Sequence, residues 1–337
     1  MSDVDFHSLG FETKEMFDFP AIVNVEVLRG ECPCRCRHCP LGIKDAESRK
    51  NFFGNKKINL KLFEKIVAEL ARHQNSSLRI HAVGEPLLWA DLPKAVVLSK
   101  KKSVHSWIFT CAVTNDRELL KHLCANVDII EVSINSIDEA DYLKTKGINS
   151  FGAVKANIAA MSEYIKNQGL KTRLIVSRVQ SLDQIVDQAF TEFWKSSGLV
   201  SDAFVRSFHN YNNIISNTLS LTGTGQASHE SCLVHWARFN ISVDGQAIVC
   251  FNELFRDKIE PTLILGDLKT QTIAEIWQGQ KLNAIRRAEL ANNYSTLGLA
   301  DALPCKNCTF CQPLKSGRQT SEHQIDELKK SKYEKDF

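Results

Sequence analysis

The sequence predicts an α/β protein whose strands form a parallel sheet, arranged as a partial (β/α)6 barrel of the TIM-like type. From about residue 22 to residue 210, six apolar runs rich in β-branched and aromatic residues alternate with segments of helical period. A repeated order of strand, helix, strand indicates parallel strands joined by crossover helices. Six units are too few for a closed eight-stranded barrel, so we expect a barrel that is open along one side.

The individual elements follow from local patterns. In residues 59–73 the apolar positions fall on one helical face, which predicts an amphipathic helix. In residues 91–102, Asp91 is suited to cap a helix and Pro93 to occupy its first turn. The predicted strands cover residues 22–27, 78–83, 106–113, 128–134, 173–179 and 202–208.

The composition changes after about residue 215. Residues 209–231 are rich in Asn, Ser, Thr and Gly, which is typical of a linker or lid. Two short strands around Asp244 and Gly245 predict a β-hairpin, and residues 272–290 have a helical pattern. We therefore predict a barrel domain at 1–215, a small α+β domain at 216–314 and a charged tail without function at 315–337.

Composition and charge exclude several classes of protein. The formal net charge of +3 is too small to indicate nucleic acid or an anionic membrane as an obligatory partner. The opening residues do not resemble a secretory signal, and no run of about 18 apolar residues occurs. The eleven cysteines are clustered, which favours metal binding in a reducing compartment. We expect a cytoplasmic protein that binds neither nucleic acid nor a membrane.

The densest cysteine cluster is CPCRCRHC at residues 32–39, directly after the first predicted strand. A disulfide between such near neighbours would be strained, and four zinc ligands in eight positions would be cramped. The spacing Cys32-x3-Cys36-x2-Cys39 resembles the signature of the radical S-adenosylmethionine (radical SAM) superfamily. The resemblance implies that these three thiolates hold a [4Fe–4S] cluster, whose open iron chelates SAM, while Cys34 is a bystander.

A second match to the same superfamily follows the second predicted strand. Gly84-Glu85-Pro86 corresponds to the Gly-Glu-Pro turn, which in the family meets the amino group of SAM. His38 stands where the family usually has an aromatic residue near adenine. The resemblance also implies polar contacts to SAM from residues at the ends of later strands, where parallel sheets bind ligands: Ser133, Asn135 and Ser177.

The C-terminal cysteines resemble the SPASM or twitch extension of radical SAM enzymes. The DG hairpin between Cys232 and Cys250 belongs to this pattern. The resemblance implies one auxiliary [4Fe–4S] cluster, because five cysteines cannot fill two sites of four thiolates each. Spacing alone leaves a zinc ribbon open as an alternative. The preferred cluster ligands are Cys232, Cys250, Cys305 and Cys308, with Cys311 as a spare thiol or an alternative to Cys305.

Two cysteines lie outside both clusters. Cys124 falls in a helical run and is expected to be a small buried apolar residue. Cys111 lies near the end of the third predicted strand. Some radical SAM epimerases use a cysteine to return a hydrogen atom to the substrate radical, and this role for Cys111 is a hypothesis.

Together these resemblances predict a radical SAM partial barrel followed by a small SPASM or twitch domain with a β-hairpin. The implied activity is reductive cleavage of SAM to a 5′-deoxyadenosyl radical, which abstracts hydrogen from substrate. We expect a small hydroxylated substrate (a sugar, cyclitol or nucleoside) that is oxidised or epimerised, with electrons from a flavodoxin or ferredoxin. The alternatives are a peptide- or protein-modifying enzyme and a non-catalytic iron–sulfur or zinc protein.

Overall fold

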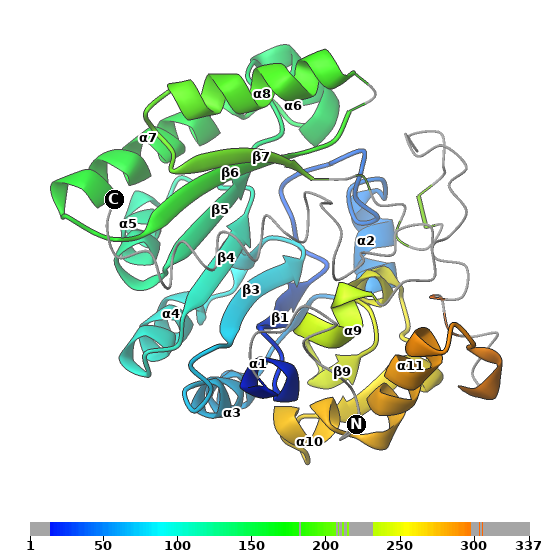
Figure 1. Cartoon of the computed structure of the whole chain (residues 1–337). Helices are drawn as coiled ribbons and strands as arrows, with labels where there is room; N and C mark the ends of the chain where they lie inside the picture. The colour runs from blue at the N-terminus through cyan, green and yellow to red at the C-terminus, as the bar shows by residue number, and fades with distance from the viewer. Residues whose placement is uncertain are drawn as a thin grey trace.

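The computed structural model describes residues 14–181, 183–206, 208, 211, 214, 215, 232–297, 303 and 305. Its centre is one ten-stranded sheet, curved into a partial barrel (Figure 1). Six neighbouring strands of this sheet are parallel, as the sequence predicted. In sheet order they are β1 (Ile22–Arg29), β3 (Ser77–Val83), β4 (Ser106–Thr110), β5 (Ile129–Ser133), β6 (Arg173–Val179) and β7 (Asp202–Arg206).

Crossover helices cover the outer face of the sheet (Figure 1). In α3 the predicted apolar face is buried, with Phe63 and Val67 fully enclosed. Asp91 stands at the start of α4, but its side chain pairs with Lys94 at 3.0 Å and makes no capping hydrogen bond. These helices are α3 (Leu60–Leu70), α4 (Leu92–Lys101), α5 (Arg117–Asn126), α6 (Glu139–Lys146), α7 (Phe151–Asn167) and α8 (Gln184–Ser196).

The C-terminal strands extend the same sheet past β1. Strand β8 (Arg238–Ile241) pairs in parallel with β1, and β9 (Gln246–Ile248) and β10 (Ile264–Asp267) follow antiparallel. The predicted hairpin joins β8 to β9, and its Gly245 has φ +88°, a conformation that glycine adopts without strain. The predicted helical stretch 272–290 is two helices, α10 (Ile273–Trp277) and α11 (Gln280–Leu290), which are separated at Gly279. A short helix, α9 (Leu233–Ala237), precedes β8.

Some strands end earlier than predicted because the backbone turns there. The strand predicted at 106–113 ends at Thr110, and Ala112 has φ +53°. The strand predicted at 128–134 ends at Ser133, and Asn135 has φ +64°. Local sequence patterns also did not predict α9, β10 or the short elements α1 (Lys14–Asp18), α2 (Ala46–Phe53) and β2 (Lys56–Lys57).

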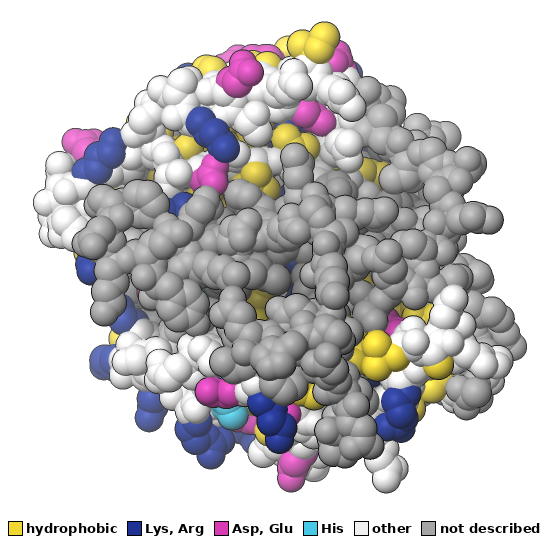
Figure 2. All heavy atoms as spheres, in the orientation of Figure 1, with side chains coloured by type: hydrophobic (Ala, Val, Ile, Leu, Met, Phe, Trp, Pro, Cys, Tyr) yellow, Lys and Arg dark blue, Asp and Glu magenta, His cyan; other side chains and the backbone are white. Residues whose placement is uncertain are grey.

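The surface agrees with the small net charge. Lys and Arg side chains are interspersed with Asp and Glu over the described part of the face in Figure 2. The longest described helix, α7, has 17 residues, and none of the described helices is long and apolar enough to span a bilayer. The predicted tail at 315–337 and the linker residues 216–231 lie outside the described residues.

An apolar layer closes one end of the barrel, and polar side chains line the rest of its interior. An apolar layer near the amino ends of the strands contains Ile22, Trp107, Ile129, Ile175 and Phe204. Beyond this layer the inward-facing side chains are mostly polar or charged and buried. They include Asn24, Arg79, His81, Glu131 and Ser177, with the half-buried Arg206 beside them. A polar interior is unusual for a barrel core, which is normally filled by branched apolar side chains, and it marks this space as a ligand site.

Candidate active site

The cysteine-rich loop between β1 and α2 is held by a single arginine. Arg49 of α2 donates hydrogen bonds to four backbone carbonyls of this loop. The acceptors are Cys32 (3.0 Å), Cys34 (2.9 Å), Gly42 (3.3 Å) and Lys44 (3.1 Å). A rigid guanidinium fork with several acceptors orders a loop more strongly than separate neutral hydrogen bonds would. Arg49 therefore presets the shape of the loop that carries the predicted cluster ligands.

Two glycines allow the loop to pack tightly. A Cβ atom on Gly42 would lie 2.1 Å from the carbonyl oxygen of Cys36, so only glycine fits there. Gly147 ends α6 with φ +68°, and a Cβ atom on it would lie 2.6 Å from Cβ of Arg35. The backbone N–H of Arg35 donates to the carbonyl of Lys146 at 2.7 Å. The loop is thus clamped between α2 and the end of α6.

The thiols of this loop are crowded. The Sγ atoms of Cys32, Cys34 and Cys111 all lie within 4.8 Å of one another. Contacts with the Cys111 and Cys34 thiols lower the pKa of Cys32 to about 6. The contact with Cys34, together with burial, raises the pKa of Cys36 to about 11, and burial raises that of Cys39 to about 11. So many thiols in a buried site fit a cationic iron–sulfur group, which keeps its ligands deprotonated.

Cys32 and Cys34 lie too close together to serve as two ligands of one cubane cluster. The Cys34 side chain is buried beside Cys32 and Cys111, close enough for the three sulfurs to share one ion. Each thiolate of a [4Fe–4S] cluster binds a different iron, so its ligands lie further apart than those of a single ion. Cys36 and Cys39 belong to no such tight group among the described residues. The arrangement is compatible with Cys32, Cys36 and Cys39 as the ligand set.

This arrangement gives a test of the ligand set. Cys34→Ala should retain the iron of the N-terminal cluster, whereas Cys36→Ala should lose about four irons per chain. Iron content after anaerobic reconstitution measures both variants. Loss of about four irons from Cys34→Ala, with none lost from Cys36→Ala, would contradict the assignment.

The Gly84-Glu85-Pro86 turn is tied to the start of the cysteine loop. A Cβ atom on Gly84 would lie 2.3 Å from the carbonyl oxygen of Glu31, and the Glu85 N–H donates to that oxygen at 2.8 Å. The buried Glu85 carboxylate accepts from the Thr110 hydroxyl at 2.6 Å and from the Cys111 N–H at 2.7 Å. The turn therefore aligns the end of β4 with the cysteine loop, a role that the sequence motif alone did not indicate.

A buried lysine lies beside the predicted SAM-binding residues. Lys146 Nζ donates to Ser133 Oγ at 3.0 Å, and both side chains line the same cavity. Burial lowers the pKa of Lys146, but the charge interaction with the neighbouring cysteines, Cys36 foremost, outweighs burial and raises the pKa overall, so the ammonium stays protonated. A cation at this position can bind the carboxylate of SAM. Sequence reasoning missed Lys146, because only the fold brings the end of α6 next to β5.

This position predicts a change in cofactor affinity. Lys146→Met should weaken SAM binding by about 2 kcal/mol, or roughly thirtyfold, because a buried charge partner of the carboxylate is removed. Equilibrium binding of SAM to the reconstituted protein measures the effect. Lys144→Met, at an exposed position in the same helix, is the matched control. Equal SAM affinity for Lys146→Met at equal iron content would exclude this role.

The other predicted SAM-binding residues have different positions. His38 lines the cavity, and its Nε2 lies 3.1 Å from Asn135 Nδ2. Asn135 Oδ1 accepts from the Val179 N–H at 2.9 Å, which joins the ends of β5 and β6. Ser177 donates to Glu131 at 2.7 Å. Pro86, Asn135 and Ser177 do not themselves line the cavity.

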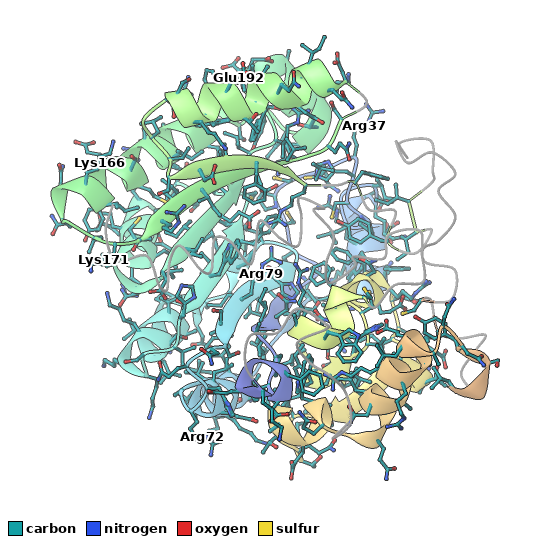
Figure 3. The ribbon with its side chains drawn as sticks, viewed as in Figure 1. Arg37, Arg72, Arg79, Lys166, Lys171 and Glu192 are labelled. Atoms are coloured by element: carbon teal, nitrogen blue, oxygen red, sulfur yellow. The ribbon has the colours of Figure 1, made fainter. Side chains whose placement is uncertain are left out.

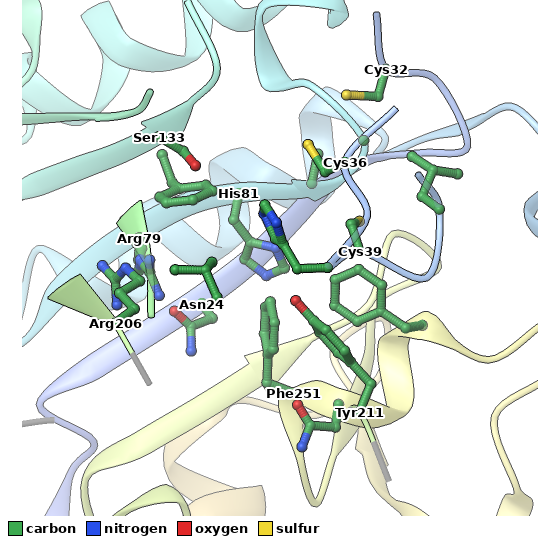
Figure 4. Close-up of a pocket in the computed structure, with 18 of the residues that line it drawn as sticks. Asn24, Cys32, Cys36, Cys39, Arg79, His81, Ser133, Arg206, Tyr211 and Phe251 are labelled. Atoms are coloured by element: carbon green, nitrogen blue, oxygen red, sulfur yellow. The ribbon is translucent and has the colours of Figure 1, made fainter. Parts of the chain in front are cut away.

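One cavity of about 270 Å³ joins both groups of cysteines. Figure 4 shows Cys32, Cys36 and Cys39 at one end of it and Arg79 with Arg206 at the other. Residues of the C-terminal strands and of the segment after β7 form the remaining wall, including Tyr211, Arg238 and Phe251. Cys111 lines the cavity next to the cysteine loop, so its predicted role as a hydrogen donor stays a hypothesis.

The predicted auxiliary ligands Cys232, Cys250 and Cys305 line the same cavity. His235 lies beside them, with Nε2 3.7 Å from Cys305 Sγ and Nδ1 2.6 Å from a carboxylate oxygen of Glu289. A carboxylate behind a histidine that contacts a thiolate ligand is a common second layer around metal sites. The three thiols fit an iron–sulfur group here, with the imidazole beside it. Cys308 and Cys311 lie outside the described residues.

Comparisons with known proteins agree with this geometry. The sequence model of the radical SAM superfamily matches residues 28–189, and that of the SPASM iron–sulfur cluster-binding domain matches residues 232–311. No curated protein shows significant sequence similarity to the chain.

Several solved structures share the fold. BtrN, in complex with AdoMet and 2-DOIA, is 15% identical with a TM-score of 0.54, covering 89% of this chain and 97% of its own. SuiB from Streptococcus suis, bound to the precursor peptide SuiA, is 13% identical with a TM-score of 0.61. The match covers 81% of this chain and 68% of the SuiB chain. The enzyme anSMEcpe, with AdoMet and the Cp18Cys peptide, is 12% identical with a TM-score of 0.57. The match covers 92% of this chain and 96% of the anSMEcpe chain.

These matches also indicate the cofactors. The radical SAM domain implies a [4Fe–4S] cluster and SAM, and the SPASM domain implies auxiliary iron–sulfur binding. The thiol-rich loop and the second group of thiols supply suitable donors for both. The two family models together span most of the chain, in the order that the fold displays. The protein therefore belongs to the radical SAM superfamily and carries a C-terminal SPASM domain.

Proposed function

We propose that this enzyme abstracts a hydrogen atom from a small hydroxylated molecule, a sugar, cyclitol or nucleoside, and oxidises or epimerises it. The bound cluster and SAM together supply the reactive species, a 5′-deoxyadenosyl radical formed by one-electron reduction of SAM. The observation that supports a small hydroxylated substrate best is the group of buried polar side chains along the cavity, Asn24, Arg79 and His81, because such groups fix the orientation of a small polar ligand.

The chain's own residues bind and orient the reactants. The cysteine loop, the Gly84 turn and the Lys146–Ser133 pair surround the position proposed for SAM. The substrate would occupy the polar interior between this position and the closed end of the barrel. Asn24 and His81 there have buried polar atoms without a partner among the described residues, and these atoms can bind hydroxyl groups. Phe251 packs against His81, with ring centroids 4.8 Å apart, and helps to exclude water.

The comparison with BtrN supports a small-molecule substrate. Its structure was solved with 2-DOIA bound, and this chain covers 97% of it, compared with 68% of the peptide-bound SuiB. The full-length match to the peptide complex of anSMEcpe favours the alternative, a peptide- or protein-modifying enzyme. The family assignment argues against a non-catalytic iron–sulfur or zinc protein. We also propose a cytoplasmic location and an electron donor of the flavodoxin or ferredoxin type, because the clusters need reducing conditions.

The test is substrate-dependent formation of 5′-deoxyadenosine. The reconstituted enzyme is given SAM and dithionite with a panel of sugars, cyclitols and nucleosides or with a panel of peptides. We expect a hydroxylated small molecule to increase 5′-deoxyadenosine formation and, when deuterated, to transfer deuterium into it. Stimulation and deuterium transfer by a peptide, with none from the small molecules, would establish the alternative instead.

A further inference from the structure

Three arginines, one buried and two half-buried, converge on the end of the cavity that lies away from the cysteine loop. They are Arg79 of β3, Arg206 of β7 and Arg238 of β8, and we call this group the arginine end. Figure 3 shows Arg79 in the interior, whereas Arg72 and Lys166 lie at the periphery. Figure 4 shows Arg79 and Arg206 side by side, facing into the cavity.

The curvature of the sheet brings the arginines of β7 and β8 near each other. Strands β7 and β8 are far apart in the sheet order, with β1, β3, β4, β5 and β6 between them. The sheet curves so that the two strands face one another, and the charge of Arg206 acts on both Arg79 and Arg238. The domain that carries β8 therefore contributes a cation to the substrate cavity as well as cluster ligands.

Two of these guanidiniums, Arg79 and Arg206, share a single carboxylate partner among the described residues. This partner is Glu131, the one carboxylate among the described residues that forms an ion pair with Arg79 or Arg206. It accepts two hydrogen bonds from Arg206 Nη2, at 2.5 and 2.6 Å, lies 3.7 Å from Arg79 Nη2 and also accepts from Ser177. Burial and the charge of Arg206 lower the pKa of Arg79 to about 9 and that of Arg238 to about 10. One carboxylate thus pairs with two guanidiniums, and Arg238 lies near the Cys232 and Cys250 thiols, whose charge raises its pKa against burial.

Polar atoms in the same region lack hydrogen-bond partners within the described structure. Arg79 Nε and both ring nitrogens of His81 are buried without one, and so is Asn24 Oδ1. Arg79 is nine-tenths buried and lines the cavity. Buried polar groups in native proteins are nearly always satisfied, so an unpartnered guanidinium nitrogen at a cavity wall indicates a ligand.

We propose that the arginine end binds an anionic group of the substrate, a carboxylate or a phosphate. This inference rests on the proposed function and narrows it to a small hydroxylated molecule with an anion at one end, such as a sugar acid, sugar phosphate or nucleotide. Planar guanidiniums match both anions in bidentate geometry. With the anion held there, the rest of the substrate points toward the cysteine loop.

The arginine end is separate from the position proposed for SAM. Arg79 precedes Val83, the last residue of β3, by four residues, which is about 13 Å of strand. The Gly84 turn begins only after Val83, and Lys146 provides a different cation beside Ser133. Two cationic positions at different depths can therefore hold the SAM carboxylate and the substrate anion at the same time.

The test uses the reconstituted enzyme with SAM bound, so that the SAM carboxylate position is filled. Inorganic phosphate and acetate are titrated by calorimetry at fixed ionic strength into wild type, Arg79→Met and Arg238→Met. Arg72→Met, at an exposed position, is the matched control. We expect at least one anion to bind wild type and Arg72→Met equally, and to bind each cavity variant at least tenfold more weakly. Tighter phosphate binding would identify a phosphorylated substrate, and tighter acetate binding a carboxylate.

Two results would overturn the inference. One is that neither anion binds the SAM-loaded wild type, and the other is that both cavity variants bind as tightly as wild type. If Arg79→Met fails to fold, Arg238→Met still provides the test. In Arg238→Met, Glu131 keeps both of its partners, Arg79 and Arg206. SAM cleavage by wild type is measured in parallel. An enzyme that cleaves SAM but binds neither anion refutes only this inference, whereas an enzyme that cleaves no SAM refutes the proposed function.

Discussion

Replacing Cys32, Cys36 and Cys39 together by alanine should abolish 5′-deoxyadenosine formation and remove about four irons per chain. The reason is that a cluster must have three thiolate ligands to keep one iron open for SAM. The second group of thiols, at Cys232, Cys250 and Cys305, should keep its iron. Iron analysis and the dithionite-driven assay on the same sample measure both effects.

The matched control is the double variant Cys232→Ala/Cys250→Ala. It removes two predicted auxiliary ligands that line the same cavity and should lose only auxiliary iron. The N-terminal cluster should remain able to support SAM cleavage without substrate. If the triple variant still produced 5′-deoxyadenosine at the wild-type rate, the N-terminal loop would not be the SAM-cleaving site.

Glu131→Gln should lower the free energy of unfolding by about 3 kcal/mol or more. Its carboxylate is the counter-charge for Arg79 and Arg206, and removing one partner of a buried ion pair leaves the other charge uncompensated. Urea unfolding of the anaerobic apo-protein measures the change. Glu118→Gln, which breaks an exposed pair with Lys121, is the control and should leave stability almost unchanged.

The same carboxylate predicts a pH dependence. Burial raises the pKa of Glu131, but Arg206 and Arg79 outweigh burial and hold the pKa below its ordinary value of 4.5. A lowered pKa in the folded state stabilises the protein above about pH 4.5 and loses that effect as the pH falls. The difference between wild type and Glu131→Gln should therefore shrink in acid. A constant difference from neutral pH to pH 3 would show that the carboxylate charge does not matter.

Local patterns in the sequence predicted most of the barrel. Strand composition and helical period identify β1 and β3 to β7, because both depend on neighbours within a few residues. They could not predict that β8 pairs with β1, since about 210 residues separate Arg238 from Arg29 and no local signal connects them. They also extended the strand at 106–113 too far, because a positive φ at Ala112 has no reliable sequence signature.

For the site as well, the sequence predicted the residues that lie close together in the chain and not those that come together only through the fold. The cysteine spacing and the Gly84-Glu85-Pro86 turn could be found because ligands of one cluster lie in one loop. Arg49, Lys146 and the arginine end could not, because each acts through contacts that the fold makes between distant segments. Alternation along β3 places Arg79 on the inward face, but an arginine in a strand is more often at an exposed position. Only the curvature of the sheet shows that Arg206 and Arg238 approach it.

The most direct test of the central claim is the metal content and SAM cleavage of the wild-type chain. After anaerobic reconstitution we predict about eight irons per chain, as two [4Fe–4S] clusters require, little zinc, and 5′-deoxyadenosine when dithionite and SAM are added. Stoichiometric zinc, little iron and no 5′-deoxyadenosine would contradict this account, because the cysteines would then have a structural role.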